Sequence, residues 1–452
     1  MTFSVGDYIF DRDRMLFYRQ TLPDDVRLSI EREIPPGDDI GAVKRSLDEY
    51  IAAPCCVSNK LFAGIGICLT YNCQMRCNYC SFESEEKGGE ARSLTADDAI
   101  AYVRKAMRDI LTNELLTGKR PPLQVIFTGG GEPTYDWALF QTVVSHIVEM
   151  ARRNDIEYSV EITTNGMLSE EQIAFIAGNV NQVMLSFDGL PDTQNANRRV
   201  GGRAASFEIA DRSIRAFNKY GTRLFLRSTI WQKDFERMTD MAKFVCANYD
   251  FADWSVMPAM PQGRALSGDD FMETPPTDFF DSYIAALRYV RREYPEKHMS
   301  TPVFPNGETT YFCGALFTMC PWLLPNGKIV SCLEAYGNVS HIGEVSGGAV
   351  KFYDAFENRI APVVRRLYDE CGDCAAFRFC RGNCPLEAMT ADRYFRKWSC
   401  AQIRRYYDFV FSKVLQGKRC LGWSARRVEG WADYEVLSLV PPTIHTAAEP
   451  QS

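Results

Sequence analysis

The stretch CQMRCNYC, residues 73–80, places three cysteines in a C-x3-C-x2-C spacing directly after an apolar run. Three thiolates this close on one loop can bind a single inorganic centre. A tetrahedral zinc site or an ordinary four-iron cluster requires a fourth ligand, whereas three ligands leave one iron open to bind another molecule. From spacing alone, the alternative is a zinc knuckle that takes a distant fourth cysteine.

Around this loop, apolar runs of strand character alternate with amphipathic stretches of helical length. The expected strands are 64–70, 123–128, 158–163, 182–187, 223–230 and 254–257, and the expected helices are 96–117, 136–153, 169–178, 205–219 and 233–248. Ser93 is predicted to cap the first helix. This alternation predicts an α/β fold with a parallel sheet. Six strands fit a partial barrel or an open doubly wound sheet, and the pattern does not separate the two.

The composition excludes several function classes. The chain has 452 residues, 46% of them hydrophobic, and a net charge of −7, which argues against a broad nucleic-acid-binding face. No apolar run has the length of a membrane span, and acidic residues stand in the first fifteen residues, where a signal peptide requires an apolar run. We therefore expect a cytoplasmic protein with no membrane partner. Sixteen cysteines in a reducing compartment suggest metal ligation more than disulfides.

A second group of cysteines lies in the C-terminal region, where short apolar runs and many glycines replace the regular alternation. Its eight thiols suffice for two four-ligand sites. They are Cys313, Cys320, Cys332, Cys371, Cys374, Cys380, Cys384 and Cys400. A turn at 325–327 between two short strands is expected to bring Cys320 and Cys332 together. A treble-clef zinc region is the alternative, although structural zinc would need only four of the eight.

Polar and glycine-rich motifs follow the expected strands at the ends where ligand loops of a parallel sheet belong. They read TGGGEP at 128–133, TTNG at 163–166 and SFDG at 186–189. Glycines allow close backbone approach, so the first motif and Glu132 could hold an ammonium group. Arg198 could clamp a carboxylate through its planar guanidinium.

Together with the first cysteine loop, these motifs resemble the radical S-adenosylmethionine (SAM) superfamily over roughly residues 64–260. The resemblance implies a partial (β/α)6 barrel in which Cys73, Cys77 and Cys80 hold a [4Fe–4S] cluster whose open iron is chelated by SAM. Reduction then cleaves SAM to a 5′-deoxyadenosyl radical, which abstracts a hydrogen atom from an unactivated C–H bond. The SAM contacts that it implies are Tyr79, Gly129, Gly130, Gly131, Glu132, Thr164, Asn165, Ser186, Asp188, Arg198 and Arg227. The family's His-Asp pair is replaced here by Gln194-Asn195.

The C-terminal spacing is similar to the SPASM extension of radical SAM enzymes over about 313–400. This resemblance implies two auxiliary [4Fe–4S] clusters, and hence three clusters in all. Cluster I would be held by Cys313, Cys320, Cys332 and Cys384, and cluster II by Cys371, Cys374, Cys380 and Cys400. Full ligation favours electron transfer over substrate binding at these clusters. Five other cysteines are left without a ligand role, of which Cys68 and Cys246 are expected in the core and Cys420 and the pair Cys55-Cys56 carry no assigned function.

The expected organisation has five parts: an N-terminal extension (1–60), the radical SAM core (61–260), a connecting segment (261–310), the SPASM region (311–402) and a C-terminal helix and tail (403–452). The extension could bind a leader peptide on a strand edge near residues 8–17. The alternative is an extension that caps the barrel.

SPASM enzymes mostly modify peptides or proteins, so the resemblance implies an oxidoreductase that matures a ribosomally made precursor peptide, with leader and core. The favoured reaction is a net two-electron oxidation to an intramolecular C–C, C–O or C–S crosslink, with a reductant such as flavodoxin or ferredoxin. The first alternative is formylglycine formation by an anaerobic sulfatase maturase. That family's proposed catalytic Asp directly follows the third cysteine of the first auxiliary set, where this chain has Leu333 and then Glu334.

Two further alternatives are a peptide epimerase and an iron–sulfur electron-transfer scaffold. Epimerisation needs an exposed thiol that donates a hydrogen atom, either Cys246 or Cys420. The scaffold is disfavoured by the complete first cysteine loop and GGGEP turn. The catalytic base is not assigned by the sequence: Glu161, Asp188 and Glu334 are the candidates.

Overall fold

The computed structural model describes residues 2–34, 36, 61–82, 93–201, 205–260, 263–267, 279–304, 320–333, 341–353, 366, 369–371, 373–384, 394–421, 423–429 and 435–440. Cys55, Cys56, Cys313 and Glu334 lie outside these residues. The chain divides into two compact units. Unit 1 comprises Met1–Pro54, Val303–Cys313 and Ile360–Ser452, and unit 2 comprises Cys55–Pro302 and Gly314–Arg359.

Unit 2 is built on parallel strands that lie in the sheet in the order in which they occur in the chain. These strands are β4 (Gly64–Ile67), β6 (Leu123–Phe127), β7 (Tyr158–Thr164), β8 (Gln182–Ser186), β10 (Leu224–Ile230) and β11 (Asp253–Pro258). A doubly wound sheet would reverse its strand order at a switch point. The sequential order therefore confirms the partial barrel and excludes the open alternative.

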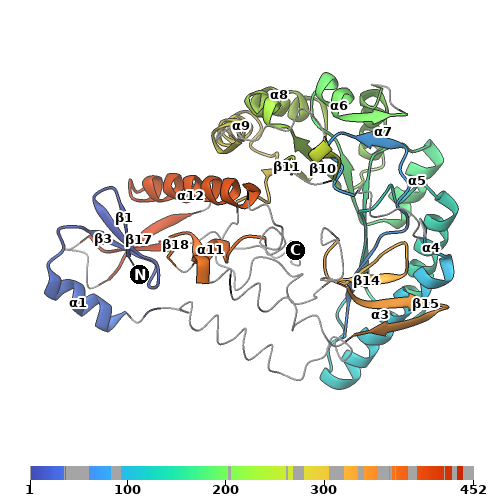
Figure 1. Ribbon diagram of the computed structural model, residues 1–452, viewed down its shortest axis with the longest axis horizontal. Coiled ribbons are helices and arrows are strands. Elements are labelled where there is room, and N and C mark those ends of the chain that lie inside the picture. Colours follow the sequence, from blue (N-terminus) through green and yellow to red (C-terminus); the bar gives the residue numbers. More distant parts are fainter. Residues whose placement is uncertain are drawn as a thin grey trace. The chain divides into compact units, whose positions relative to one another are not determined.

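Helices connect successive strands of this barrel (Figure 1). They are α3 (Ala96–Thr117), α4 (Trp137–Arg153), α5 (Glu170–Asn179), α6 (Pro191–Asn197), α7 (Phe207–Lys219) and α8 (Met238–Asn248), the last preceded by a 3-10 turn at Gln232–Arg237. The predicted cap of α3 is wrong. Thr95, not Ser93, accepts the hydrogen bond from the Asp98 backbone at 3.1 Å. Ser93 lies too early for this role and instead bonds the Thr70 hydroxyl at 2.8 Å.

The sheet of unit 2 continues beyond the barrel strands on both sides. After α9 (Phe279–Glu293), β12 (Met299–Ser300) pairs with β11. On the other side β13 (Trp322–Leu323) pairs with β4 and is followed by β14 (Lys328–Val330), β15 (His341–Ser346) and β16 (Ala349–Phe352). The antiparallel β13–β14 pair confirms the predicted hairpin, and its turn uses Gly327 at a φ of +79°.

Unit 1 contains one antiparallel sheet that combines both ends of the chain. Its order is β1 (Thr2–Val5), β2 (Tyr8–Asp11), β3 (Leu16–Arg19), β18 (Leu437–Val440) and β17 (Ser424–Arg427). The helices of this unit that fall within the described residues are α1 (Asp24–Glu33), α11 (Phe377–Cys380) and α12 (Tyr394–Val414). Because β3 pairs with β18, segments that the sequence assigned to separate extensions share one sheet.

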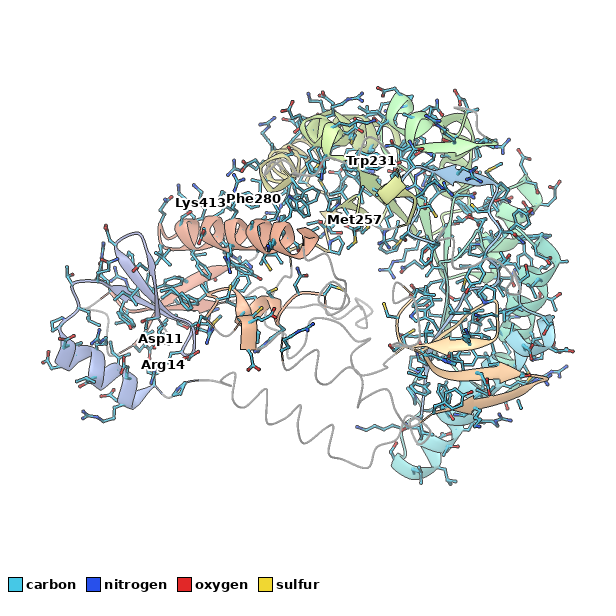
Figure 2. The ribbon with its side chains drawn as sticks, viewed as in Figure 1. Asp11, Arg14, Trp231, Met257, Phe280 and Lys413 are labelled. Atoms are coloured by element: carbon cyan, nitrogen blue, oxygen red, sulfur yellow. The ribbon has the colours of Figure 1, made fainter. Side chains whose placement is uncertain are left out.

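This sheet corrects the predicted docking edge near residues 8–17. β2 and β3 are paired on both sides, so the end strands of the described sheet are β1 and β17. Phe10 and Phe17 are fully buried, and both rings pack against Phe411 with centroids 4.7 and 5.3 Å away. Asp11, the last residue of β2, forms an ion pair of 3.0 Å with Arg14 on the turn that connects β2 to β3 (Figure 2). Both strands are therefore part of the core of unit 1.

Across the described part of the chain, no helix combines the length and the apolar character that a membrane-spanning helix requires.

Candidate functional site

The three cysteines of the first loop follow β4, the first barrel strand, where ligand loops of a parallel barrel are found. Cys77 ends the short strand β5 (Met75–Cys77), and the Cys80 backbone N–H bonds the Cys77 carbonyl at 3.2 Å. Burial raises the pKa of Cys77 to about 11, and the adjacent Cys80 adds to this increase. The thiols are therefore near one another on a single loop.

Backbone and amide N–H groups surround Cys73. The Met75 N–H donates to its Sγ at 3.4 Å and the Asn165 amide at 3.7 Å. The Cys73 side chain reaches solvent, but surrounding protein atoms and the Glu132 carboxylate raise the pKa of its thiol to about 12. Soft sulfur donors with N–H groups directed at them are the ligand set of iron–sulfur clusters, so these residues fit the implied cluster.

The glycine turn after β6 lies directly against this loop. A Cβ at Gly131 would lie 2.0 Å from the Asn72 carbonyl oxygen, and one at Gly130 would lie 2.2 Å from Cys68 Sγ. The Gly131 N–H bonds the Thr70 carbonyl at 2.7 Å. Glycine is therefore required here because the backbone of the turn touches the backbone of the cysteine loop.

Glu132, at the end of this turn, connects it to the loop after β7. Its buried carboxylate accepts hydrogen bonds from the hydroxyls of Thr134 and Thr164, both at 2.8 Å, and from the Asn165 backbone at 2.7 Å. Burial raises the Glu132 pKa, and these hydrogen bonds oppose the increase. Three of the predicted SAM contacts, Glu132, Thr164 and Asn165, therefore form one connected group.

Tyr79, Asp188 and Arg198 form a second connected group of predicted contacts. The Tyr79 hydroxyl donates to Asp188, and the Arg198 guanidinium bonds the same carboxylate at 2.9 Å. Asp188 is fully buried, and Arg198 and Tyr79 are 6% and 9% exposed. Among the described atoms, Arg198 Nε has no hydrogen-bond partner, so one donor remains available for a ligand.

Gln194 and Asn195, which replace the family's His-Asp pair, form hydrogen bonds to the backbone next to the group that contains Asp188. Gln194 Oε1 accepts a hydrogen bond from the Asp188 backbone at 2.8 Å. Asn195 Oδ1 accepts one from the Phe207 backbone, also at 2.8 Å. The two amides therefore fix the segment between β8 and α7.

Arg227 and Ser186 occupy paired positions on β10 and β8. Arg227 is partly buried and donates a hydrogen bond to Met257 Sδ at 3.0 Å (Figure 2 labels Met257). The structure thus places both residues on neighbouring barrel strands, and their predicted contact with SAM stays a prediction.

One candidate base, Glu161, lies on β7. Gln182 donates a hydrogen bond of 3.3 Å to its carboxylate, and burial raises the Glu161 pKa, an effect opposed by Arg223. The pKa of Cys320 is raised to about 12 by burial and by the Glu161 carboxylate, which places the two side chains near each other. Asp188 is fully engaged by Arg198 and Tyr79, so it is a poor candidate.

The predicted auxiliary ligands lie in both units. Cys320 and Cys332 belong to unit 2, whereas Cys384 and the four ligands assigned to cluster II belong to unit 1. Burial raises the pKa of Cys380, and Cys400, Cys371 and Cys374 add to this increase. Within the described residues, no group of three or more His, Cys, Asp or Glu side chains forms a site for a single metal ion.

Three contacts at the candidate site were not predicted from the sequence. Cys68, expected only as a core residue, donates a hydrogen bond to the Gly129 carbonyl at 3.2 Å. Arg264 donates to the Cys77 carbonyl at 2.5 Å. Leu333 Cδ1 lies 2.6 Å from the position that a Cβ on Gly129 would occupy. None of these contacts has a local motif, since each joins segments far apart in the sequence.

Comparisons with known proteins agree with this geometry. Residues 67–245 match the family model described as "Radical SAM superfamily". The chain is 18% identical over 361 residues to the cysteine-type anaerobic sulfatase-maturating enzyme of Clostridium perfringens, covering 76% of this chain and 94% of the relative.

Two solved structures are similar in fold. One is native anSMEcpe with bound AdoMet, at a TM-score of 0.57 and 15% identity, covering 78% of this chain and 98% of the other. The other is the same protein with bound AdoMet and the Cp18Cys peptide, at a TM-score of 0.58 and 15% identity, covering 79% and 99%.

Proposed function

Residues 67–245 form a radical SAM domain, and from this premise we propose that the chain is a maturase that oxidises a peptide or protein by two electrons and forms an intramolecular crosslink. The cluster and SAM, when bound, supply a radical that abstracts a hydrogen atom from a substrate C–H bond. Closing the crosslink breaks a second X–H bond, so one proton and one electron must also leave the substrate. The electron would pass to the auxiliary clusters.

The chain's own residues have separate roles in this proposal. Cys73, Cys77 and Cys80 hold the cluster. Glu132, fixed by the hydroxyls and N–H groups of the two loops, orients the amino group of SAM, and the close turn backbone excludes water around it. These positions agree with the loops at the carboxyl ends of barrel strands that bind ligands in such folds.

We propose that Glu161 is the base that accepts the proton leaving the substrate when the crosslink closes. Its pKa is raised by burial, which makes it a stronger base than an exposed carboxylate, and Gln182 orients one of its oxygens. Its proximity to Cys320, a proposed ligand of auxiliary cluster I, would let the proton and the electron leave in the same direction.

The observation that carries the crosslinking proposal is the contact of Leu333 with the Gly129 turn. Leu333 occupies the position at which sulfatase maturases are proposed to carry a catalytic Asp. An apolar side chain cannot accept a proton at the position from which formylglycine formation is proposed to remove it. The proton would instead leave toward Glu161, and we propose that this different position of the base favours closure of the substrate radical onto a second side chain.

Formylglycine formation is the second candidate, favoured by a match that spans 94% of the sulfatase-maturating relative. The epimerase has less support, because Cys246 and Cys420, the thiols that it would need at the surface, are 4% and 9% exposed. The complete cysteine loop and Glu132 network support an enzyme over an electron-transfer scaffold. A flavodoxin or ferredoxin in the cytoplasm would supply electrons.

Anaerobic co-expression separates the two leading candidates. The enzyme would be produced once with a cysteine-type sulfatase and once with each short open reading frame beside its gene. A hydrazide probe for aldehydes then tests every product. We expect no aldehyde on the sulfatase and a modified short peptide without an aldehyde. Stoichiometric aldehyde on the sulfatase would overturn the crosslinking assignment in favour of formylglycine formation.

A further inference from the structure

The loop that carries the first three cysteines is paired with the segment that follows β8. The short strand β5 pairs antiparallel with β9 (Arg198–Val200), and in this register Cys77 lies opposite Arg198. The Asn78 backbone N–H also bonds the Asn197 carbonyl at 2.9 Å. Arg198 is therefore tied through its backbone to a proposed ligand of the SAM-binding cluster.

The Arg198 side chain is fixed as firmly as its backbone. Its guanidinium bonds Asp188 at 2.9 Å and lies 5.3 Å from the centroid of the Tyr79 ring. Asp188 is held in turn by the backbone N–H of Thr229 at 3.2 Å. Both charges are buried, so water screens them little and their electrostatic effects on neighbouring groups are large.

Arg198 is the member of this ion pair that lies directly opposite Cys77 in the strand pairing. The Asp188 carboxylate is engaged by both the Tyr79 hydroxyl and the Arg198 guanidinium. Arg264 brings a second positive charge to the same cysteine, because its guanidinium donates a hydrogen bond of 2.5 Å to the Cys77 carbonyl. Positive charge therefore lies next to a proposed ligand of the cluster.

We propose that the Asp188–Arg198 ion pair raises the reduction potential of the [4Fe–4S] cluster held by Cys73, Cys77 and Cys80. This inference rests on the proposed function only in requiring that cluster. Reduction adds one electron from an external low-potential donor such as a ferredoxin. The reduced cluster is thus more negative by one charge, and a fixed positive charge stabilises it more than the oxidised cluster.

Arg198 would accordingly be a positioning residue with a measurable electrostatic signature. The test is an EPR-monitored redox titration of the full-length, anaerobically reconstituted protein. The signal that changes on addition of SAM identifies the cluster with the open iron. The variants are Arg198→Gln, Arg198→Lys, Asp188→Asn and Arg264→Gln, with iron content measured for each.

The expected shifts differ in sign. Arg198→Gln lowers the midpoint potential, Arg264→Gln lowers it less, and Asp188→Asn raises it, because removing the carboxylate leaves the buried positive charge uncompensated. Arg198→Lys keeps the charge and stays near the wild-type potential.

Shifts of Arg198→Gln and Asp188→Asn in the same direction, no shift in either, or a larger shift in Asp188→Asn than in Arg198→Gln would overturn the proposal. If Arg198→Gln does not retain iron, the test rests on the other two variants. Asp188→Asn is then expected to raise the midpoint potential and Arg264→Gln to lower it, and shifts in the same direction would overturn the proposal. The titration contains no peptide, so failure of the crosslinking function would leave this result unaffected.

Discussion

The backbone N–H of Asn165 donates a 2.7 Å hydrogen bond to Oε2 of Glu132 and so joins the turn after one barrel strand to the loop after the next. A carboxylate suits this position because its hydrogen-bond partners Thr134, Thr164 and Asn165 all donate to it. The buried charge that results faces the cysteine loop, where its field reaches Cys73.

Glu132→Gln should weaken SAM binding about 10- to 100-fold. The amide loses the charge and turns an N–H toward these donors, and a hydrogen bond to a charged group contributes about 1.5–3 kcal/mol. Anaerobic equilibrium dialysis with labelled SAM measures the change. Glu149→Gln on the exposed face of α4 is the matched control. Unaltered SAM affinity in Glu132→Gln would show that this carboxylate does not bind the ligand.

Replacing Gly129 and Leu333 together tests their contact. Gly129→Ala should lower SAM affinity at least about tenfold, because its φ of +78° is strained for alanine and the new Cβ would meet Leu333. Adding Leu333→Ala removes the clash but leaves the strained φ, so the double variant should recover only part of the affinity. A double-mutant cycle quantifies the coupling. Strictly additive losses would mean that the contact has no role at the turn.

The iron content of single-cysteine variants should distinguish the cluster of the Cys73–Cys80 loop from the proposed auxiliary clusters. With three [4Fe–4S] clusters the reconstituted protein holds about twelve iron atoms per chain, and loss of one cluster leaves about eight. Cys77→Ala should lose one cluster and SAM cleavage together. Cys380→Ala should lose one cluster and keep SAM cleavage, but lose product. Cys246→Ala, which removes a buried thiol outside both groups, should keep all the iron. A wild-type protein with about four iron atoms would refute the auxiliary clusters.

Glu161→Gln should separate SAM cleavage from product formation. The variant still makes 5′-deoxyadenosine, but without a base the substrate radical is not closed, and product falls by about 100-fold or more. In the wild type, product formation should rise as pH increases through a pKa that lies above the ordinary 4.5 of glutamate, because the base acts when ionised. The pH dependence should vanish in Glu161→Gln. Equal product from both proteins would exclude this residue as the base.

Much of the barrel could be predicted because its signals are local. Alternating burial along β7 and β10 follows from the alternation of apolar side chains, and each strand was placed within a few residues. The strand order could not be predicted, because barrel and doubly wound sheets share the same local pattern. The cap at Thr95 was missed because both Ser93 and Thr95 are suitable cap residues.

Site residues could be predicted only where they lie close together in the sequence, within one short motif. The Cys73–Cys80 loop and the Gly129–Glu132 turn have such motifs, and the structure places them in contact through Thr70 and Asn72. The hydrogen bond from Tyr79 to Asp188 joins residues more than one hundred positions apart, which no local pattern reports. The pairing of β3 with β18 is a long-range contact of the same kind.

The most direct test of the crosslinking account is the mass of the peptide after reaction with reconstituted enzyme, SAM and reductant. The account predicts that the peptide loses two hydrogen atoms, that fragmentation locates the loss between two side chains, and that about one 5′-deoxyadenosine forms per product. A peptide of unchanged mass that gains deuterium in heavy water, or one that carries an aldehyde, would contradict it.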